Sequence, residues 1–365
     1  MPLAIVHTES SLGWGGQEIR ILSEAQGLAR RGHDVKLLCP PEARIYAEAP
    51  NWALRPIAMP IAKKRPAGFR ALRNWLRANR CDVVSTHSST DSWLAALALA
   101  SLGRPVPMVR TRHISAPVPK NALSRWLYTR ATSRIVTAGQ ALRKELIERN
   151  GFLAERIDSV PTGVDPAVYR PGDMATARTG LGLPQQKTLI GIVATLRSWK
   201  GHRYLVEAIA QMPNTVELVI VGDGPQFAAL QTQVASLGVA DRVKFAGNQR
   251  AVVPWLQAFD IFALPSYANE GVPQALLQAM LCGLPCVTTN AGSIAELAKD
   301  GETALLVPPQ DPGALRMALS ILIENASLRK ELGEAARRHC VDKYTSDLML
   351  DRMEEIYTAV ASAGK

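Results

Sequence analysis

An acidic residue, Glu270, lies on a Gly-containing turn directly before a helical pattern in this 365-residue chain. The turn continues through Gly271 and Val272, and the apolar residues that precede it indicate a buried strand. A loop between a strand and a helix is where open parallel sheets bind ligands, and the free N–H groups of a helix start attract anions. A carboxylate beside such an anion site predicts a ligand that joins phosphate to a polyhydroxyl group, as a nucleotide sugar does.

Two cations, Arg197 and Lys200, follow a predicted strand in the second half of the chain. Together they could neutralise a diphosphate, because charge-assisted hydrogen bonds to phosphate are strong. The alternative is a pair of solvated surface charges, which is about as common for an isolated Arg-x-x-Lys. The pair therefore adds a candidate anion site to the turn at Glu270.

Glycines and histidines follow strands in the first half of the chain. Gly15 and Gly16 lie between the first predicted strand and the first long helix, where glycine lets the backbone approach a phosphate. The alternative is a simple tight turn. His87 and His113 each follow a predicted strand, where an imidazole can bind a phosphate or a sugar hydroxyl. Either could equally be a loop histidine with satisfied hydrogen bonds.

The sequence lacks the motifs of several other kinds of active site. No Asp-x-Asp pair follows a strand, and neither His-Glu-x-x-His nor Gly-x-Ser-x-Gly is present. The sequence therefore predicts no metal site. The five cysteines are scattered, so reduced, buried thiols in a cytosolic protein are the simplest interpretation.

Two α/β domains are needed to position these residues. The chain is long enough for two cores, and short β-rich runs alternate with helical patterns in both halves. The predicted strands are residues 3–7, 35–38, 83–86, 108–112 and 134–137, and then residues 189–194, 216–221, 243–246, 261–264, 285–288 and 304–307. Because a Pro- and Gly-rich segment joins the halves, we predict two Rossmann-like doubly wound domains that face a cleft.

We place the N-terminal domain at residues 1–170, the C-terminal domain at residues 171–345 and a final amphipathic helix at residues 346–365. Periodicity leaves open whether this helix packs on its own domain or crosses back to the first. No apolar run is long enough to span a bilayer, and the N-terminus has no basic leader.

Charge is unevenly distributed. Residues 1–170 contain 25 Lys and Arg against 13 Asp and Glu, a net of +12, whereas residues 171–365 have a net of −2. A basic half predicts an anionic surface as partner. Nucleic acid is not expected, because no recognised nucleic-acid-binding module is evident.

One predicted helix in this basic half, at residues 67–79, is amphipathic. Its apolar face contains Phe69, Leu72, Trp75 and Leu76, and arginines form another face. A basic amphipathic helix can lie on an anionic membrane. The alternative is a domain helix whose apolar face belongs to the core.

Taken together, these residues resemble the retaining family-4 glycosyltransferases of the GT-B fold, of the bacterial cell-envelope and lipopolysaccharide type. The resemblance covers nearly the whole chain. The matching elements are the Gly15-Gly16-x-Glu18 loop, the strand end at His113, the Arg197/Lys200 loop and the Glu270-Gly271-Val272-Pro273 turn.

The resemblance implies that the N-terminal half binds the acceptor and the C-terminal half binds the nucleotide sugar. Glu270 would accept hydrogen bonds from sugar hydroxyls, and His113 would contact the transferred sugar. Arg197 and Lys200 would hold the diphosphate and stabilise it as the leaving group. These four residues form the expected catalytic set.

The expected donor-binding set consists mostly of backbone amides. Gly16, beside Gly15, would give an N–H to the donor diphosphate, and the turn after Gly271 would support sugar or phosphate. Because the proline in this turn lacks an N–H, the amides of Val272 and Gln274 are the better donors. Members of the family need no metal and no cofactor beyond the donor. Their proposed mechanism is front-face attack through an oxocarbenium-like state, which retains the α configuration.

Two positions depart from the family pattern. The second Glu of the family, which binds ribose hydroxyls, is Gln278 here. A Gln carbonyl accepts a hydrogen bond without charge assistance, so we expect weaker donor binding. The family Arg, five residues before the Lys, is Thr195 here, and we assign its role to Arg197.

The resulting hypothesis is a cytoplasmic retaining hexosyltransferase that uses a UDP- or GDP-sugar. Its acceptor would be a glycan or a lipid-linked glycan in cell-envelope polysaccharide synthesis, with the inner face of the membrane as a candidate location. Two alternatives remain at this stage. One is a catalytically idle GT-B-like subunit that binds nucleotide sugar, which the departures at Thr195 and Gln278 would permit. The other is a sugar-nucleotide epimerase, which the Gly-rich turns would fit.

Overall fold

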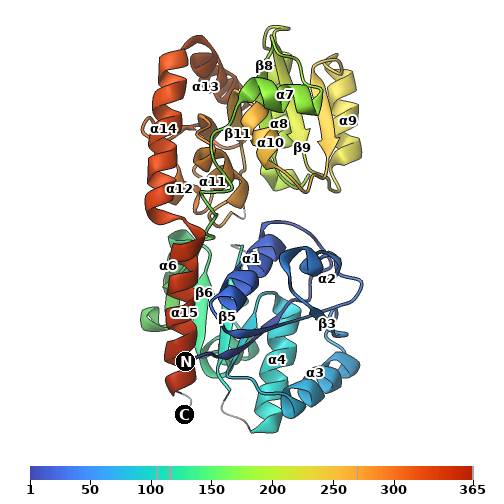
Figure 1. Cartoon of the computed structure of the whole chain (residues 1–365), viewed down its shortest axis with the longest axis vertical. Coiled ribbons are helices and arrows are strands. Elements are labelled where there is room, and N and C mark those ends of the chain that lie inside the picture. The colour runs from blue at the N-terminus through green and yellow to red at the C-terminus, as the bar shows by residue number, and fades with distance from the viewer. Residues whose placement is uncertain (104–105, 115–116, 269, 364–365) are drawn as a thin grey trace. The chain divides into compact units, whose positions relative to one another are not determined.

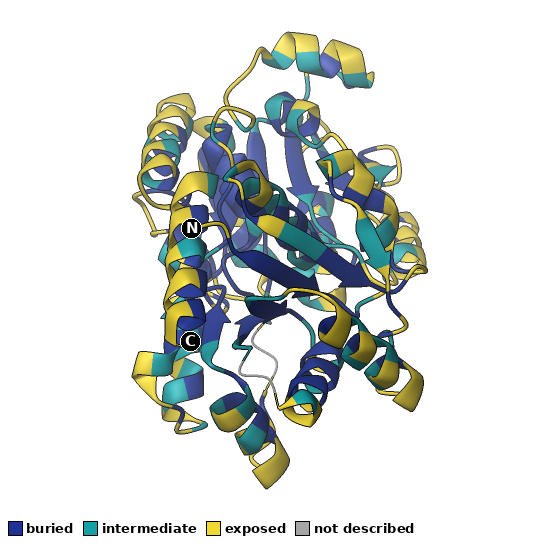
Figure 2. Ribbon diagram, turned by 60° about the horizontal axis from the view of Figure 1, so that its bottom comes forward, coloured by how far each residue is buried: buried dark blue, intermediate teal, exposed yellow. Residues whose placement is uncertain are grey.

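The structure is a computed structural model that describes residues 1–103, 106–114, 117–268 and 270–363. The chain divides into two compact units, one formed by Met1–Gly163 with Ser346–Lys365 and the other by Val164–Thr345 (Figure 1). In both units the central strands are buried, and the helices expose their outer faces (Figure 2).

The first unit is built on seven parallel strands in the order β3-β2-β1-β4-β5-β6-β7. The strands are β1 (Ala4–Thr8), β2 (Asp34–Cys39), β3 (Pro56–Ala58), β4 (Val83–Thr86), β5 (Met108–Arg112), β6 (Arg134–Thr137) and β7 (Ile157–Ser159). Because β1 pairs with both β2 and β4, the order reverses there, as in a doubly wound sheet. All five strands predicted for this half are confirmed. The two that were missed, β3 (Pro-Ile-Ala) and β7 (Ile-Asp-Ser), each contain a single β-branched residue and no continuous apolar run.

Helices cover both faces of this sheet. They are α1 (Gly16–Arg30), α2 (Arg44–Glu48), η1 (Ala49–Trp52), α3 (Pro66–Ala78), α4 (Ser89–Leu102), α5 (Ala122–Trp126), η2 (Leu127–Ala131), α6 (Gln140–Glu148), η3 (Ala154–Arg156) and α15 (Ser346–Ala363). Helix α5 continues directly into a π-helical turn, η2.

The last helix, α15, belongs to the first unit and packs against α1. Gly27 makes this approach possible, because a Cβ at this position would lie 2.4 Å from the Leu350 side chain. Apolar residues of α15, including Met353 and Ile356, join a core cluster with β1, β4 and β5. Burial of this face holds the end of the chain on the sheet.

The amphipathic helix α3 packs its apolar face against α4. Leu72 and Leu76 are buried, and Phe69 and Trp75 are half-buried against the same core cluster. Of the two interpretations that the sequence left open for this face, the core is confirmed. The opposite face of α3, which includes Arg70 and Arg77, is exposed to solvent.

The second unit is built on six parallel strands in the order β10-β9-β8-β11-β12-β13. The strands are β8 (Thr188–Val193), β9 (Val216–Val221), β10 (Val243–Gly247), β11 (Ile261–Leu264), β12 (Cys286–Thr288) and β13 (Leu305–Leu306). All six are at the predicted places. Its helices are α7 (Met174–Leu181), η4 (Ser198–Lys200), α8 (His202–Ala210), α9 (Phe227–Ser236), α10 (Val253–Ala258), α11 (Gln274–Leu281), α12 (Ile294–Leu297), α13 (Pro312–Glu324) and α14 (Ala326–Lys343).

The core of the second unit is densely packed and apolar. The Phe259 ring packs directly against Gly191 on β8, and a Cβ at Gly191 would lie 2.0 Å from this ring. The sheet is again doubly wound, because β8 lies between β9 and β11. Among the described helices of both units, none is at once long and apolar enough to cross a bilayer.

Candidate active site

In the second unit, an ion pair joins two of the predicted site residues, Lys200 and Glu270. Lys200 Nζ lies 2.6 Å from Glu270 Oε1, and the two side chains are 18% and 6% exposed. Lys200 ends η4, which follows β8, and Glu270 lies between β11 and α11. Because β8 and β11 are neighbours in a parallel sheet, their following loops meet at the same edge. A cation and a carboxylate are thus placed together at the carboxyl end of the sheet.

Two glycines allow the backbone around this ion pair to pack closely. Gly201 has φ 77° and follows Lys200, and a Cβ there would lie 2.0 Å from the carbonyl oxygen of Pro265. Gly292 has φ 59°, and its Cβ would lie 2.1 Å from the carbonyl oxygen of Glu270. Larger residues would be strained at both positions and would also collide with backbone. The position of the Glu270 loop is therefore set by main-chain contacts.

Three buried oxygen atoms near this loop lack a hydrogen-bond partner within the described structure: Ser266 Oγ, Ser293 Oγ and Gln274 Oε1. Ser266 follows β11, and the N–H of Ser293 donates to the carbonyl oxygen of Glu270 at 3.2 Å. Buried polar atoms are nearly always paired. A polar ligand that reached this loop could satisfy such atoms.

Gln278 and Arg197 differ in how they are held. Gln278 is buried on α11, and its Nε2 donates to the hydroxyl of Tyr169 at 3.0 Å. Burial raises the pKa of Tyr169 to about 12, so its phenol stays protonated at neutral pH. Arg197 is exposed, and its guanidinium lies over the Trp199 ring at 5.7 Å from the centroid. Thr195, at the position of the family Arg, is half-buried.

The remaining predicted residues of this loop lie at the start of α11. Gly271 and Val272 are buried, and Pro273 is the N-cap. The first helical residue is Gln274, and the first N–H groups of a helix have no partner within it. The amide of Gln274 is therefore available at the helix start, two residues beyond Val272.

In the first unit, α1 begins at Gly16, directly after Gly15. A Cβ built at Gly15 would lie 3.9 Å from its nearest neighbouring atom, Glu18 Oε2. Packing within the unit therefore does not require glycine at this position. Open space above a helix start is the geometry that lets a phosphate approach backbone N–H groups.

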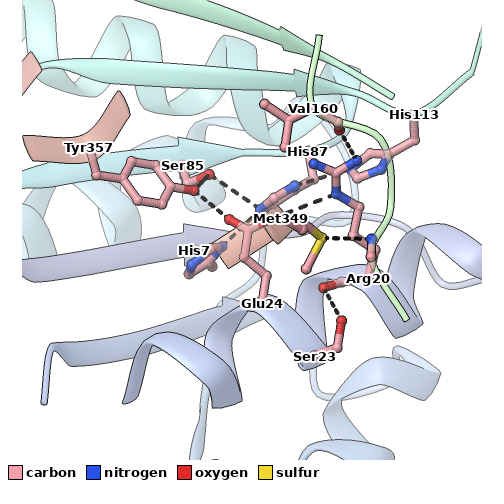
Figure 3. Close-up of polar contacts among 11 residues, drawn as sticks. His7, Arg20, Ser23, Glu24, Ser85, His87, His113, Val160, Met349 and Tyr357 are labelled. Atoms are coloured by element: carbon pink, nitrogen blue, oxygen red, sulfur yellow. Dashed lines mark hydrogen bonds and ion pairs between the residues drawn. The ribbon is translucent and has the colours of Figure 1, made fainter. Parts of the chain in front are cut away.

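His113 is the last of three histidines that are joined by hydrogen bonds (Figure 3). His87 Nδ1 lies 3.1 Å from His113 Nε2, and His7 Nδ1 lies 3.0 Å from His87 Nε2. Burial lowers the pKa of His87 and of His113 well below 6.5. The sequence pointed to His87 and His113 separately, and His7 was missed because a histidine inside an apolar strand looks like core.

A cluster of buried acids lies near the Gly15 loop and was also missed. Glu9 is fully buried and accepts hydrogen bonds from Ser88 Oγ at 2.5 Å and from Gln17 Nε2 at 2.6 Å. Burial raises the pKa of Glu9, and it also raises the pKa of Asp91 to about 7. The one available signal was position, because Glu9 directly follows β1.

Glu18 on the first turn of α1 belongs to the same acidic environment. Burial, and then the charge of Glu9, raises its pKa to about 7. In the described parts of the chain, no group of three or more His, Cys, Asp or Glu side chains is arranged to hold a metal ion.

Two doubly wound parallel sheets in one chain, with a partly buried Lys–Glu pair at a strand end of the second unit, are the architecture of the GT-B glycosyltransferases. Comparison with known proteins agrees. Residues 14–168 match the family described as Glycosyltransferase Family 4, and residues 173–339 match Glycosyl transferases group 1. A D-inositol 3-phosphate glycosyltransferase from Acidothermus cellulolyticus is 30% identical over an alignment 374 positions long, which covers 90% of this chain and 82% of the relative. The chain therefore belongs to the family-4 glycosyltransferases.

Solved structures share this fold. A glycosyltransferase from Rickettsia africae has a TM-score of 0.87 at 20% identity, with 98% of both chains covered. Anabaena HepE, in complex with UDP-glucose, has a TM-score of 0.87 at 22% identity, with 98% of this chain and 100% of that chain covered. At this level of identity the likeness concerns the fold, which is GT-B.

Proposed function

We propose that the chain is a retaining, metal-independent hexosyltransferase. It takes a sugar from a nucleotide-sugar donor and transfers it to a glycan or lipid-linked acceptor of the cell envelope. The observation that carries the proposal is the Lys200–Glu270 pair at the carboxyl end of the second sheet. A donor needs a cation for its diphosphate and an acceptor group for its sugar hydroxyls, and this pair supplies one of each.

In this proposal, Lys200 turns from Glu270 to the diphosphate when the donor binds. The freed carboxylate of Glu270 accepts hydrogen bonds from sugar hydroxyls, which are stronger than those to a neutral acceptor. Arg197 is exposed and can swing from Trp199 onto the diphosphate. The backbone amide of Gln274 adds a neutral donor to the same anion. That Anabaena HepE is known in complex with UDP-glucose supports a UDP-sugar as the first donor to test.

The chemistry that we propose is front-face attack by the acceptor hydroxyl. The bond from the anomeric carbon to the diphosphate breaks as Lys200 and Arg197 stabilise the charge on the leaving phosphate. A phosphate oxygen takes the acceptor proton, and the new bond forms on the face that the diphosphate leaves. The anomeric configuration is then retained. No metal or further cofactor is needed in this scheme, because cationic side chains meet the developing charge.

The acceptor and location are proposed from charge. The basic first half, with a net of +12, favours an anionic acceptor such as a pyrophosphate-linked lipid. Exposed cations of one segment, Lys63, Lys64, Arg65, Arg70 and Arg77, could rest on an anionic inner membrane face. Each cation near such a surface contributes about 1 kcal/mol. We propose a cytoplasmic protein that contacts the membrane peripherally through these charges.

A donor panel tests the proposal. Thermal unfolding is followed with UDP-glucose, other UDP-sugars and GDP-sugars, because a ligand at 100 times its Kd stabilises the native state by about 2.7 kcal/mol. The stabilising donor is then incubated with acceptor, and the product linkage is determined. A retained α linkage supports the proposal. Donor binding without transfer or hydrolysis would indicate an idle subunit, and an epimerised donor would indicate an epimerase.

A further inference from the structure

Three of the histidines in the first unit, His7, His87 and His113, lie at the carboxyl ends of three neighbouring strands. His7 lies on β1, His87 follows β4, and His113 follows β5, and these strands are adjacent in the order β1-β4-β5. The rings of His7 and His87 are almost coplanar, with an interplanar angle of 8° and centroids 5.2 Å apart. With nitrogen atoms 3.0 Å apart, the two rings meet edge to edge, as a hydrogen bond requires (Figure 3).

Burial determines how many protons the three imidazole rings carry. Desolvation is the largest cause that lowers the pKa of each of the three histidines, so each ring is neutral at pH 7 and carries one proton. The two N···N hydrogen bonds also need one proton each. Only two arrangements satisfy both conditions. Either all three rings are protonated on Nδ1, or all three are protonated on Nε2.

His7, at the buried end of the three hydrogen-bonded histidines, distinguishes the two arrangements. His7 Nε2 is buried and has no hydrogen-bond partner in the described structure. In the Nε2 arrangement this atom would be an orphaned N–H donor, which is rarer in proteins than an unsatisfied acceptor. In the Nδ1 arrangement it is a bare nitrogen, and the surplus proton lies on His113 Nδ1 instead. His113 is half-buried, so its proton can reach a ligand.

We propose that His7 and His87 are positioning residues that hold His113 in its Nδ1-protonated tautomer, so that His113 donates a hydrogen bond to an oxygen of the transferred sugar. The sugar contact rests on the proposed function. The chain of hydrogen bonds runs from His7 Nδ1–H to His87 Nε2, and from His87 Nδ1–H to His113 Nε2. The hydrogen bond on one ring nitrogen thereby fixes the proton on the other.

The structure around the chain keeps these rings in place. Tyr357 of α15 meets the His7 ring edge-on, with centroids 6.2 Å apart and an interplanar angle of 89°. The Tyr357 hydroxyl bonds Glu24 Oε1 at 2.7 Å and Ser85 Oγ at 2.8 Å. Helix α15 therefore packs against His7, at the buried end of the three hydrogen-bonded histidines.

The direct test reads the proton positions by NMR. The chain has six histidines, so ¹⁵N-histidine labelling and long-range ¹H–¹⁵N spectra resolve each ring, with assignment from single-histidine variants. At pH 7.5, without substrate, we expect His113 to be protonated on Nδ1 and bare on Nε2. A His113 ring protonated on Nε2, or on both nitrogens, would overturn the proposal.

Two variants at His87 separate positioning from packing. In His87→Asn, the amide nitrogen is two bonds from Cβ, as Nδ1 is, and can still donate to His113 Nε2. In His87→Leu, this donor is lost. We expect His113 to keep its tautomer in the Asn variant, and the Nδ1-protonated share to fall about tenfold relative to the other tautomer in the Leu variant. The same tautomer in both variants, or its loss in both, contradicts the assignment. His339→Asn, in the second unit, is the control.

A second comparison tests the contact with the sugar. In His113→Asn the amide replaces Nδ1, and in His113→Gln it replaces Nε2. With UDP-glucose as donor, we expect UDP release by the Asn variant to be about tenfold faster than by the Gln variant. The reverse order would overturn the donor role of Nδ1. Wild-type protein that shows no transfer from any donor would instead remove the proposed function, and the tautomer result would stand independently.

Discussion

The two sheets of this chain have similar topology but place their polar groups differently. In the first unit, the strands themselves end in buried polar residues, such as His7 and Thr8 on β1 and Ser85 and Thr86 on β4. In the second unit, β11 is wholly apolar, and the charged groups of the site, Lys200 and Glu270, come from loops after the strands.

This difference affects which groups are charged. Inside the first unit, desolvation lowers the pKa of His7, His87 and His113 and raises the pKa of Glu9 and Glu18. At the loop edge of the second unit, Lys200 and Glu270 can share a partly hydrated ion pair. The first unit is thus suited to directed neutral hydrogen bonds, and the second to holding an anion.

The sharpest contrast in stability involves Arg20 of α1, which is fully buried. Its Nη1 donates to the carbonyl oxygen of Val160 at 2.7 Å, and its Nε lies 3.7 Å from Glu24 Oε2 (Figure 3). Arg20→Met leaves the Glu24 charge buried without its partner, so we expect a loss of about 3–5 kcal/mol in the free energy of unfolding. Arg203→Met breaks a similar but exposed pair with Glu207 in the second unit and should cost less than about 0.5 kcal/mol. Urea unfolding measures both, and equal losses would refute the contrast.

Activity should depend most on the loop pair of the second unit. Glu270→Ala removes the acceptor for sugar hydroxyls, and we expect kcat/KM to fall about a thousandfold with the fold retained. Glu302→Ala, an exposed residue of the same unit, is the matched control and should change turnover by less than about twofold. Initial rates with the donor identified by the panel give both values. Undiminished turnover in Glu270→Ala would remove the assignment.

The buried acids of the first unit predict a pH-dependent stability. Glu18 has its pKa raised from 4.5 to about 7 by burial and by Glu9. A raised carboxyl pKa means that the folded state binds more protons between these values, so its stabilising contribution is lost as pH rises from about 4.5 to 7. Glu18→Gln should therefore match the wild type near pH 4 and exceed it by about 2–3 kcal/mol at pH 8. Unfolding at both pH values checks this, and a pH-independent difference would contradict the pKa assignment.

The smallest expected effect concerns the family departure at Gln278. Gln278→Glu places a carboxylate beside the Tyr169 hydroxyl, which stays protonated and can donate to it. A charge-assisted hydrogen bond to the donor ribose should then lower the donor Kd by about tenfold. Calorimetry on the two proteins measures this change. Weaker donor binding in the Glu variant would show that Gln278 serves the contact with Tyr169 instead.

Much of the fold followed from local patterns. Strands β4, β5, β6, β9 and β11 have the predicted limits, because uninterrupted β-branched and apolar runs are strong signals. The three-residue strands β3 and β7 gave no such signal. The neighbourhood of Lys200 and Glu270 followed from their places after strands, whereas the buried groups His7, Glu9 and Arg20 did not. Each of the three also binds a residue far away in the sequence: His87 for His7, Ser88 for Glu9 and Val160 for Arg20.

What the sequence determined alone was the alternation of strands and helices, the uneven charge and the residues that follow strand ends. Those features depend on contacts within a few residues and on composition. The tertiary structure decided which strand ends are neighbours. It places β1 beside β4, and β4 beside β5, so that His7, His87 and His113 meet. It also folds α15 back onto α1, which closes the polar interior with Tyr357. Pairings of this kind are set by burial of the whole core, which no local pattern encodes.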